Sequence, residues 1–93
     1  MLCHPYVDRV DCHDGGKPHT IKPPLTKSPN RITYLVALHE ELVAFFEKNN
    51  VKHVAIEYAN LGMGKKNVNR HTGEVTGVLV GAALHVGASV EKA

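Results

Sequence analysis

One acidic side chain stands in an otherwise apolar stretch of this sequence. Glu57 is the only charged residue of the run VAIEYA, which covers residues 54–59. An ionised carboxylate in apolar surroundings is costly unless it is paired or bound to a cation, and functional groups of open α/β sheets gather at the carboxyl ends of strands. We therefore predict that Glu57 is a catalytic, metal-binding carboxylate. Pairing with a lysine, or an outward position on an edge strand, is the structural alternative.

Polar and basic residues follow this carboxylate along the chain. A glycine-rich loop over residues 61–67 contains two lysines, and an arginine and a histidine come shortly afterwards. Such a cluster suits a phosphodiester backbone, because the cations contact phosphates while a carboxylate holds Mg²⁺. A solvated surface loop is the alternative. The residues that we expect to contact such a backbone are Lys65, Lys66, Asn67, Asn69 and Arg70.

Two Cys-His pairs near the N-terminus offer the ligand types of a zinc site. Cys3-His4 and Cys12-His13 could supply four ligands, but paired zinc ligands usually lie about two to four residues apart. With seven histidines in the chain, adjacent Cys and His residues also arise by chance. The sequence therefore leaves zinc binding open and does not favour it.

The first thirty residues are rich in turn formers. The DGG sequence at 14–16 lies between two short β-prone runs and predicts a hairpin with strands over Tyr6–Cys12 and His19–Lys22. Two prolines at 23–24 end the second strand, since proline cannot donate to a ladder. Turn and surface positions are expected for the neighbouring aspartates, Asp8, Asp11 and Asp14.

The next segment has the pattern of an amphipathic helix. Ser28 is a suitable N-cap, Pro29 suits the first helical position, and two asparagines at 49–50 close the helix. A strand over Val51–Ala59 is predicted to follow at once, and its near-continuous apolarity is typical of a strand covered on both faces. A helix that leads directly into such a strand indicates a parallel α/β architecture. The apolar stripe of the helix consists of Ile32, Leu35, Leu38, Leu42, Phe45 and Phe46.

A second helix is predicted over Thr72–Leu84, with its first residue as N-cap and Gly87 as the stop signal. Glycines recur within it at steps of four. Each interior glycine costs about 1 kcal/mol relative to alanine, so we expect this stripe to let another backbone approach closely. Ala88–Val90 are expected to begin a further strand. The glycine stripe consists of Gly73, Gly77 and Gly81.

Length and composition limit the remaining possibilities. A chain of 93 residues has the size of one domain, and a chain this short buries only about two thirds of its unfolded surface. The net charge of +2 is too small to indicate nucleic acid by itself. The sequence has no run of roughly 20 apolar residues for a membrane span and no signal-peptide pattern. Two cysteines suggest no disulfide framework, which predicts a reducing, cytoplasmic location.

The order of these features resembles the central part of RuvC-like Holliday-junction resolvases, of the RNase H-like superfamily. The resemblance rests on the helix that begins at Arg31, the run VAIEYA, the loop with Asn67 and the helix that carries Gly77-Val78. The stretch YVDRVDCHDGGKPHTIKPP is similar to that family's second and third strands with their turn. The resemblance implies an α/β fold with an RNase H-like mixed sheet flanked by helices.

The same resemblance implies a function. These proteins are metal-dependent endonucleases that cut branched DNA in recombination and repair, and their carboxylates hold two Mg²⁺ (or Mn²⁺) ions. Glu57 matches the acidic residue of the family's fourth strand, and Lys65–Arg70 match the region that meets DNA. A homodimer is also implied, with the helix after the acidic strand near the partner subunit.

Two segments of the family pattern are not found in the sequence. The family's first strand carries an aspartate followed by a glycine, which nothing before Tyr6 supplies, and its acidic final helix would lie beyond Ala93. We therefore expect residues 1–93 to form a partial RNase H-like domain with an incomplete catalytic set. The first hypothesis is a RuvC-like nuclease or a fragment of one. The alternatives are an inactive nucleic-acid-binding module and a dimerisation module.

Overall fold

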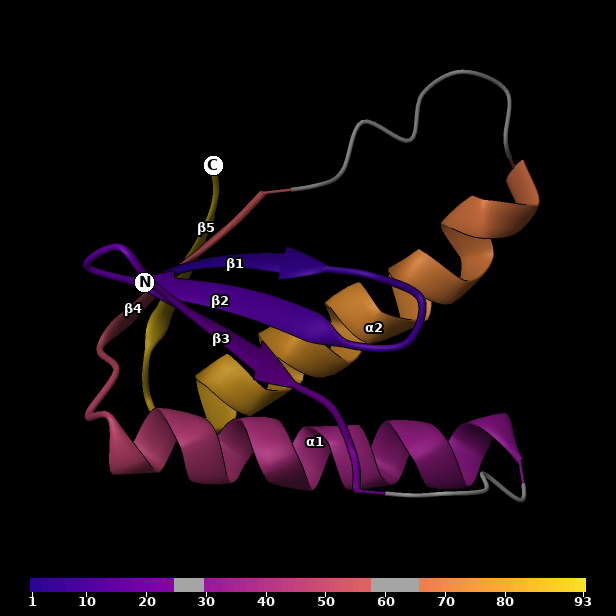
Figure 1. The fold of residues 1–93 in the computed structure, drawn as a ribbon, viewed down its shortest axis with the longest axis horizontal. Coiled ribbons are helices and arrows are strands. Elements are labelled where there is room, and N and C mark those ends of the chain that lie inside the picture. The colour runs from indigo at the N-terminus through magenta and orange to yellow at the C-terminus, as the bar shows by residue number, and fades with distance from the viewer. Residues whose placement is uncertain (25–29, 58–65) are drawn as a thin grey trace.

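A computed structural model of the chain describes residues 1–24, 30–57 and 66–93, without the side chains of 66–69. These residues form a five-stranded mixed sheet and two helices (Figure 1), so the predicted α/β class is confirmed. The strand order is β3-β2-β1-β4-β5, with β1–β4 and β4–β5 parallel and the other pairs antiparallel. The elements are β1 (Leu2–Pro5), β2 (Val10–Asp14), β3 (Lys17–Ile21), α1 (Arg31–Lys48), β4 (His53–Ile56), α2 (Lys66–His85) and β5 (Ser89–Lys92).

The hairpin of β2 and β3 forms where the DGG sequence predicts it. Gly15 and Gly16 both have a positive φ, 58° and 91°, which is the combination that a two-residue type I′ turn requires. The first strand of the hairpin begins later than predicted. Residues 6–9 form a turn before it, closed by a hydrogen bond of 2.8 Å from the N–H of Tyr6 to the carbonyl of Arg9.

The central strand β1 was not predicted. We found no counterpart of the family's first strand before Tyr6 in the sequence. In the structure β1 lies in the centre of the sheet and pairs with β2 on one side and β4 on the other. The N–H of Ala55 donates to the carbonyl of Met1 (2.8 Å), and the N–H of Glu57 donates to the carbonyl of Cys3 (2.9 Å). The backbones of β2 and β4 are therefore both paired on the side that faces β1.

Helix α1 begins at Arg31, as the family resemblance implies but two residues later than the predicted first helical position, Pro29. Its N-cap is Asn30, whose side chain accepts a hydrogen bond of 2.8 Å from the N–H of Thr33. The predicted N-cap, Ser28, lies outside the described residues. The helix ends at Lys48 with Asn49 as its C-cap, in agreement with the two asparagines that were predicted to close it.

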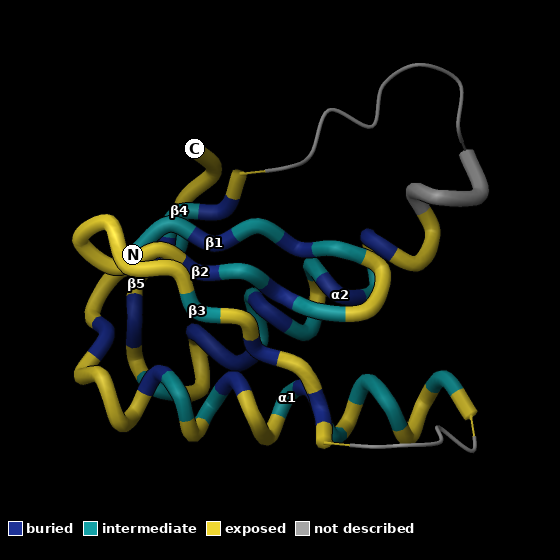
Figure 2. Tube along the Cα trace, in the orientation of Figure 1, coloured by how far each residue is buried: buried dark blue, intermediate teal, exposed yellow. Residues whose placement is uncertain are grey.

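Both helices cover one face of the sheet (Figures 1 and 2), because a single core joins them to alternate residues of the strands. In β4, Val54 and Ile56 are buried, whereas His53 is exposed. The prediction that this strand is covered on both faces was therefore wrong for the described residues. We call the uncovered side the outer face.

Ile32, predicted in the apolar stripe of α1, is 74% exposed. The core consists of Cys3, Val10, Cys12, Ile21, Leu38, Leu42, Phe46, Val51, Val54, Ile56, Val75, Leu79, Ala82, Ala83 and Ala88.

Helix α2 begins six residues before the predicted start. Thr72, predicted as the N-cap, lies inside the helix and is only 3% exposed. The other end agrees with the prediction, since Gly87 adopts φ 80° after the last turn and β5 follows.

Contrary to our expectation, no other backbone of the described residues lies close to the glycine stripe of α2. A Cβ atom added at Gly73 or Gly77 would meet nothing within 4 Å. At Gly81 it would touch only the ring of His39, at 3.9 Å, which is an ordinary van der Waals contact. Within the described residues the stripe therefore lies on open surface, apart from this one contact between the helices.

Candidate metal and nucleic-acid site

Glu57 follows β4 directly, at the carboxyl end where the sequence predicts it. Its side chain is exposed, and its alternation with Val54 and Ile56 places it on the outer face. The carboxylate is therefore solvated, and the expected cost of burying it in an apolar strand does not arise. The strand itself is internal to the sheet, between β1 and β5.

The residue beside Glu57 on the central strand is a histidine. The parallel register matches Cys3 with Ile56, so its continuation by one residue brings His4 next to Glu57. On the other side, the antiparallel register matches His4 with Asp11 of β2. One row on the outer face therefore carries a carboxylate, an imidazole and a carboxylate on three neighbouring strands.

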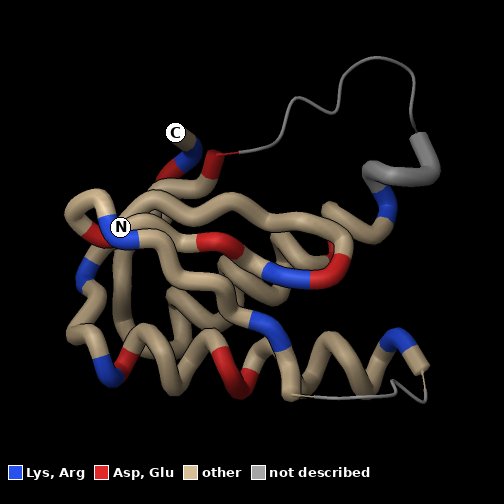
Figure 3. The backbone as a smooth tube through the Cα atoms, viewed as in Figure 1, with Lys and Arg blue, Asp and Glu red and all other residues tan. Residues whose placement is uncertain are grey.

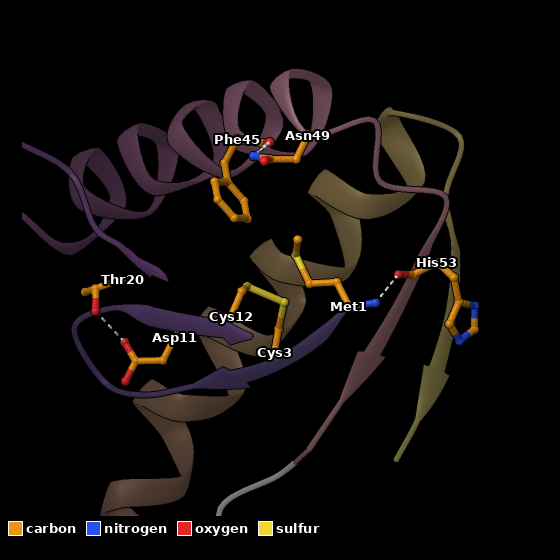
Figure 4. The surroundings of a disulfide bond; sticks show 8 residues. All are labelled: Met1, Cys3, Asp11, Cys12, Thr20, Phe45, Asn49 and His53. Carbon is orange, nitrogen blue, oxygen red and sulfur yellow. Dashed lines mark hydrogen bonds between the residues drawn. A yellow bond between two sulfur atoms is a disulfide. The ribbon is translucent and has the colours of Figure 1, made fainter. Parts of the chain in front are cut away.

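A second imidazole lies against this row. The rings of His4 and His13 meet edge to face, with 5.7 Å between their centroids and 83° between their planes. Asp11 accepts a hydrogen bond of 3.1 Å from the hydroxyl of Thr20 (Figure 4) and lies 3.3 Å from Nε of Arg9. We call this group of four ligand-type side chains the outer-face cluster: His4, Asp11, His13 and Glu57.

The outer-face cluster does not match the site that a pair of Mg²⁺ ions requires. Within residues 1–24, 30–57 and 66–93, no three His, Cys, Asp or Glu side chains are placed so that they could hold an ion. Mg²⁺ demands oxygen ligands in octahedral geometry, yet the residue beside Glu57 on the central strand is an imidazole, His4. The metal-binding role of Glu57 therefore stays a prediction.

Cys3 and Cys12 form a disulfide between β1 and β2 (Figure 4), with their Cα atoms 4.1 Å apart. Both are fully buried in the core. Successive residues of a strand point to opposite faces, so His4 and His13 lie on the outer face, away from the cysteines. A zinc site made of both Cys-His pairs is thereby excluded, and the expectation that the two cysteines form no disulfide was wrong.

The other two aspartates occupy turns, as expected. Asp14 ends β2 at the hairpin turn, and Asp8 lies in the turn before β2. The carbonyl of Asp8 accepts a hydrogen bond from the hydroxyl of Tyr34 in α1. Burial raises the pKa of Tyr34 above its ordinary value, and the charge of Asp8 adds to this effect. The contact attaches the turn after β1 to the beginning of α1.

Basic residues lie at the beginnings of both helices (Figure 3). Nε of Arg31 forms an ion pair of 2.8 Å with Glu74, and its Nη2 donates to the carbonyl of His71 at 3.1 Å. The hydrogen bond from Arg31, followed by that from His71, lowers the pKa of Glu74. These contacts join the first turn of α1 to α2.

The predicted DNA-contacting residues lie at this same end of α2. Arg70 is exposed, one residue before His71. Lys66, Asn67 and Asn69 belong to the first turns of the helix, where side chains are not described, and Lys65 lies outside the described residues.

One side-chain network was missed at the sequence level. Nδ1 of His53 lies 2.6 Å from the hydroxyl of Ser89, and its Nε2 contacts the carboxylate of Glu91. The histidine belongs to β4 and its partners to β5, 36 and 38 residues away, so only the strand register reveals the contact. The side chains of His53 and Glu91 are 45% and 61% exposed, so they do not form a buried site. We interpret the network as a structural contact that holds the edge strand β5 against β4.

Neither helix in the described part of the chain combines the length and hydropathy needed to cross a bilayer.

Comparison with known proteins identifies the fold. No protein-family model and no curated protein matches the sequence. Among solved structures, T. thermophilus RuvC in complex with a Holliday junction substrate is similar, with a TM-score of 0.71 at 12% identity. A further Thermus thermophilus RuvC structure gives a TM-score of 0.64 at 15% identity. Both matches cover 99% of this chain and 62% of the RuvC chain, so the chain spans less than two thirds of their length. The chain has a RuvC-like fold.

Proposed function

We propose that the chain is a DNA-binding module that binds branched DNA, such as a Holliday junction. The observation that carries this proposal is the similarity, over 99% of the chain, to a RuvC in complex with a Holliday junction substrate. Because one fold serves many functions, the proposal also needs support from the charges and surfaces of this chain.

The carboxyl edge of the sheet offers that support. The turn after β1 and the beginnings of α1 and α2 are held together there by the Tyr34–Asp8 and Arg31–His71 contacts. The unpaired N–H groups in the first turn of a helix favour anions such as phosphate, and Arg70 adds an exposed cation to α2. We propose that the phosphate contacts come from Lys65, Lys66, Asn67, Asn69 and Arg70.

Cleavage of the junction is a second proposal, which rests on the position of Glu57. This carboxylate is exposed at the carboxyl end of β4, beside the central strand. The chain covers 62% of the RuvC chains that it resembles, and its described residues do not fit a Mg²⁺ pair. We therefore propose nuclease activity, with Mg²⁺ or Mn²⁺ as cofactor, for a protein in which further carboxylates join Glu57. For residues 1–93 alone we expect binding without cleavage.

We also propose a homodimer, whereas the disulfide removes the ground on which a cytoplasmic location was predicted. Ile32 and Val36 lie one turn apart on α1 and are 74% and 55% exposed, and Leu84 on α2 is 59% exposed. Large exposed apolar side chains often mark an interface. Light scattering after size-exclusion chromatography tests this expectation, and a monomer at all concentrations would contradict it.

Fluorescence anisotropy with a labelled four-way junction tests DNA binding. We expect tighter binding to the junction than to a linear duplex of the same arms. Replacing Lys66 and Arg70 with alanine should lower the slope of log K against log salt by about 0.9 for each lost phosphate contact. Lys17→Ala is the matched control, because it removes one cation from the hairpin turn at the opposite edge of the sheet. An equal loss in this control would mean that binding follows net charge and not the proposed surface.

A further inference from the structure

We propose that the free edge of β3 and the adjoining side of α1 form a docking groove for an extended, acidic peptide segment of a partner protein. The segment adds to the five-stranded sheet as a further strand next to β3 and places its side chains against α1. The groove is separate from the proposed DNA surface at the beginnings of the helices, so the proposal does not depend on DNA binding.

The backbone of β3 has an unpaired side. In the described part of the chain β3 is an edge strand, and only β2 pairs with it. The two-residue turn closes with a hydrogen-bonded pair, Asp14 and Lys17, and hydrogen-bonded pairs alternate with non-hydrogen-bonded pairs along an antiparallel ladder. Asp11 and Thr20 therefore form a non-hydrogen-bonded pair. The N–H and C=O of Thr20 point away from β2, where a further strand can pair with them.

The part of this edge nearer the hairpin turn is protected against such pairing. Pro18 has the same backbone orientation as Thr20, and proline has no N–H to donate. Lys17 adds a charge beside it. Proline and lysine are both residues that protect an edge strand from further pairing. The available edge is therefore short and lies at the end of β3, beside α1 (Figure 1).

A groove of about 250 Å³ lies between this end of β3 and α1. Its apolar lining comes from Ile21 of the strand and from Ala44 and Phe45 of the helix. Ile21 is buried, and Phe45 is half-buried against the ring of His19. Because side chains that lie opposite each other across a strand pair share a face, the residue of an added strand next to Ile21 faces this groove. Helix α1 therefore supplies an apolar floor for side chains beyond the edge of the sheet.

The charges of the groove favour an acidic segment. Lys22 and Lys48 line it together with one carboxylate, Glu41, so cations outnumber anions. All three residues are exposed. A second copy of β3 would bring Lys17 and Lys22 of both chains onto one shared edge, and like charges across a strand pair are unfavourable. A segment with an acidic residue near an apolar one suits the lysines and the floor together. Strand addition of this kind gains affinity from main-chain hydrogen bonds and specificity from pockets for alternate side chains.

NMR titration of the ¹⁵N-labelled chain with the peptide acetyl-Asp-Thr-Val-Thr-Asp-amide tests the proposal. In an added strand the valine and the aspartates face the groove, and one threonine pairs with the backbone of Thr20. We expect saturable shifts at Thr20, Ile21 and Phe45, with a Kd of about 1 mM or below, and slower hydrogen exchange of the Thr20 amide. The resonances of Arg70 and His71, at the other end of the helices, should not move.

Two control peptides separate the contributions of charge and backbone. The peptide acetyl-Lys-Thr-Val-Thr-Lys-amide keeps the strand propensity but reverses the charge, and it should not bind. The acidic peptide N-methylated at both threonines keeps the charge but has no threonine N–H for the carbonyl of Thr20, and it should lose binding as well.

Variants of the chain locate the binding surface. Ala44→Glu places a carboxylate in the groove at an exposed helical position, so it should leave the fold intact and weaken binding by about tenfold or more. Lys48→Gln should weaken binding by about two- to fivefold, which is the range of an exposed ion pair. The matched control is Lys52→Gln, which removes a cation that does not line the groove and should bind like the wild type.

Circular dichroism checks that each variant is folded. No binding of the acidic peptide, equal binding of either control peptide, or unchanged binding in Ala44→Glu would overturn the proposal. A Thr20 amide that is protected in the free chain and loses protection on dilution would also overturn it, because a second copy would then occupy the edge. Junction binding is measured separately, so a chain that binds DNA but not the peptide refutes this inference and leaves the proposed function intact.

Discussion

Reduction of the disulfide between Cys3 and Cys12 should destabilise the protein strongly. The two cysteines are nine residues apart in sequence, so the bond closes a loop of about ten residues. In the chain-entropy account, a loop of this size restricts the unfolded chain enough to add roughly 2.7 kcal/mol to the free energy of unfolding at 25 °C. For a domain of this size 1 kcal/mol shifts the melting temperature by about 4–8 °C. We therefore expect reduction to lower it by roughly 10–20 °C.

Thermal unfolding followed by circular dichroism, with and without a phosphine reductant, measures this effect. Mass spectrometry after alkylation confirms the redox state of the thiols. The control is the double variant Cys3→Ala, Cys12→Ala, whose melting temperature should not respond to the reductant. A fall of less than about 4 °C in the wild type, which corresponds to less than 1 kcal/mol, would refute the reasoning. It would mean either that the bond does not form or that the short β1–β2 loop is already restricted in the unfolded chain.

Three further substitutions test other parts of the structure by thermal or chemical unfolding. Gly77→Ala should raise the free energy of unfolding by about 0.5–1 kcal/mol, because the site is open and alanine is the better helix former; destabilisation would mean that the stripe is packed against something. Because the pKa of Glu74 is lowered, its contact with Arg31 stabilises the folded protein at pH values above about 4.3, the ordinary pKa of glutamate. This stabilisation is lost as the pH falls through the lower pKa of the folded state. Glu74→Gln should therefore reduce the loss of stability in acid, and an unchanged acid profile would contradict the contact. Glu57→Gln should change stability by less than about 0.5 kcal/mol, because the side chain is exposed; a larger loss would place the carboxylate in a network that the described residues do not contain.

The parts of the fold with a local physical signal were predicted from the sequence. The DGG turn was predictable because few residues other than glycine tolerate two successive positive φ angles. Helix α1 was predictable because its buried positions recur with helical spacing, and the stop of α2 because Gly87 has no Cβ to oppose φ 80°. The same pattern predicted one position of α1 wrongly, because Ile32 fits the apolar stripe but is exposed to solvent.

The central strand could not be predicted because its signal is not local. β1 is four residues long, LCHP, and its mixture of polar and apolar residues resembles a coil. Its stability comes from pairing on both sides with strands that lie later in the chain. The start of α2 was missed for a related reason, because its first turns are polar and carry no apolar periodicity.

In the candidate site, too, the residue with a local sequence signal was predicted and the contacts between strands were not. Glu57 was identified because a single charge in an apolar run stands out, but the reason offered, burial, was wrong: alternation turns the side chain to the outer face. His4 was considered only as a partner of Cys3, since adjacency in sequence is visible and adjacency across strands is not. The alternation of side chains along β1 places Cys3 and His4 on opposite faces, and the register with β2 pairs His4 with Asp11.

Binding of residues 1–93 to a four-way DNA junction is the measurement that tests the central claim most directly. Titration of a labelled junction and of a linear duplex with the same sequence, both in EDTA, gives the two affinities side by side. We predict tighter binding to the junction, a salt slope that falls when Lys66 and Arg70 are replaced, and no cleavage of the bound junction after Mg²⁺ is added. Equal affinity for junction and duplex, or no binding to either, would contradict the account.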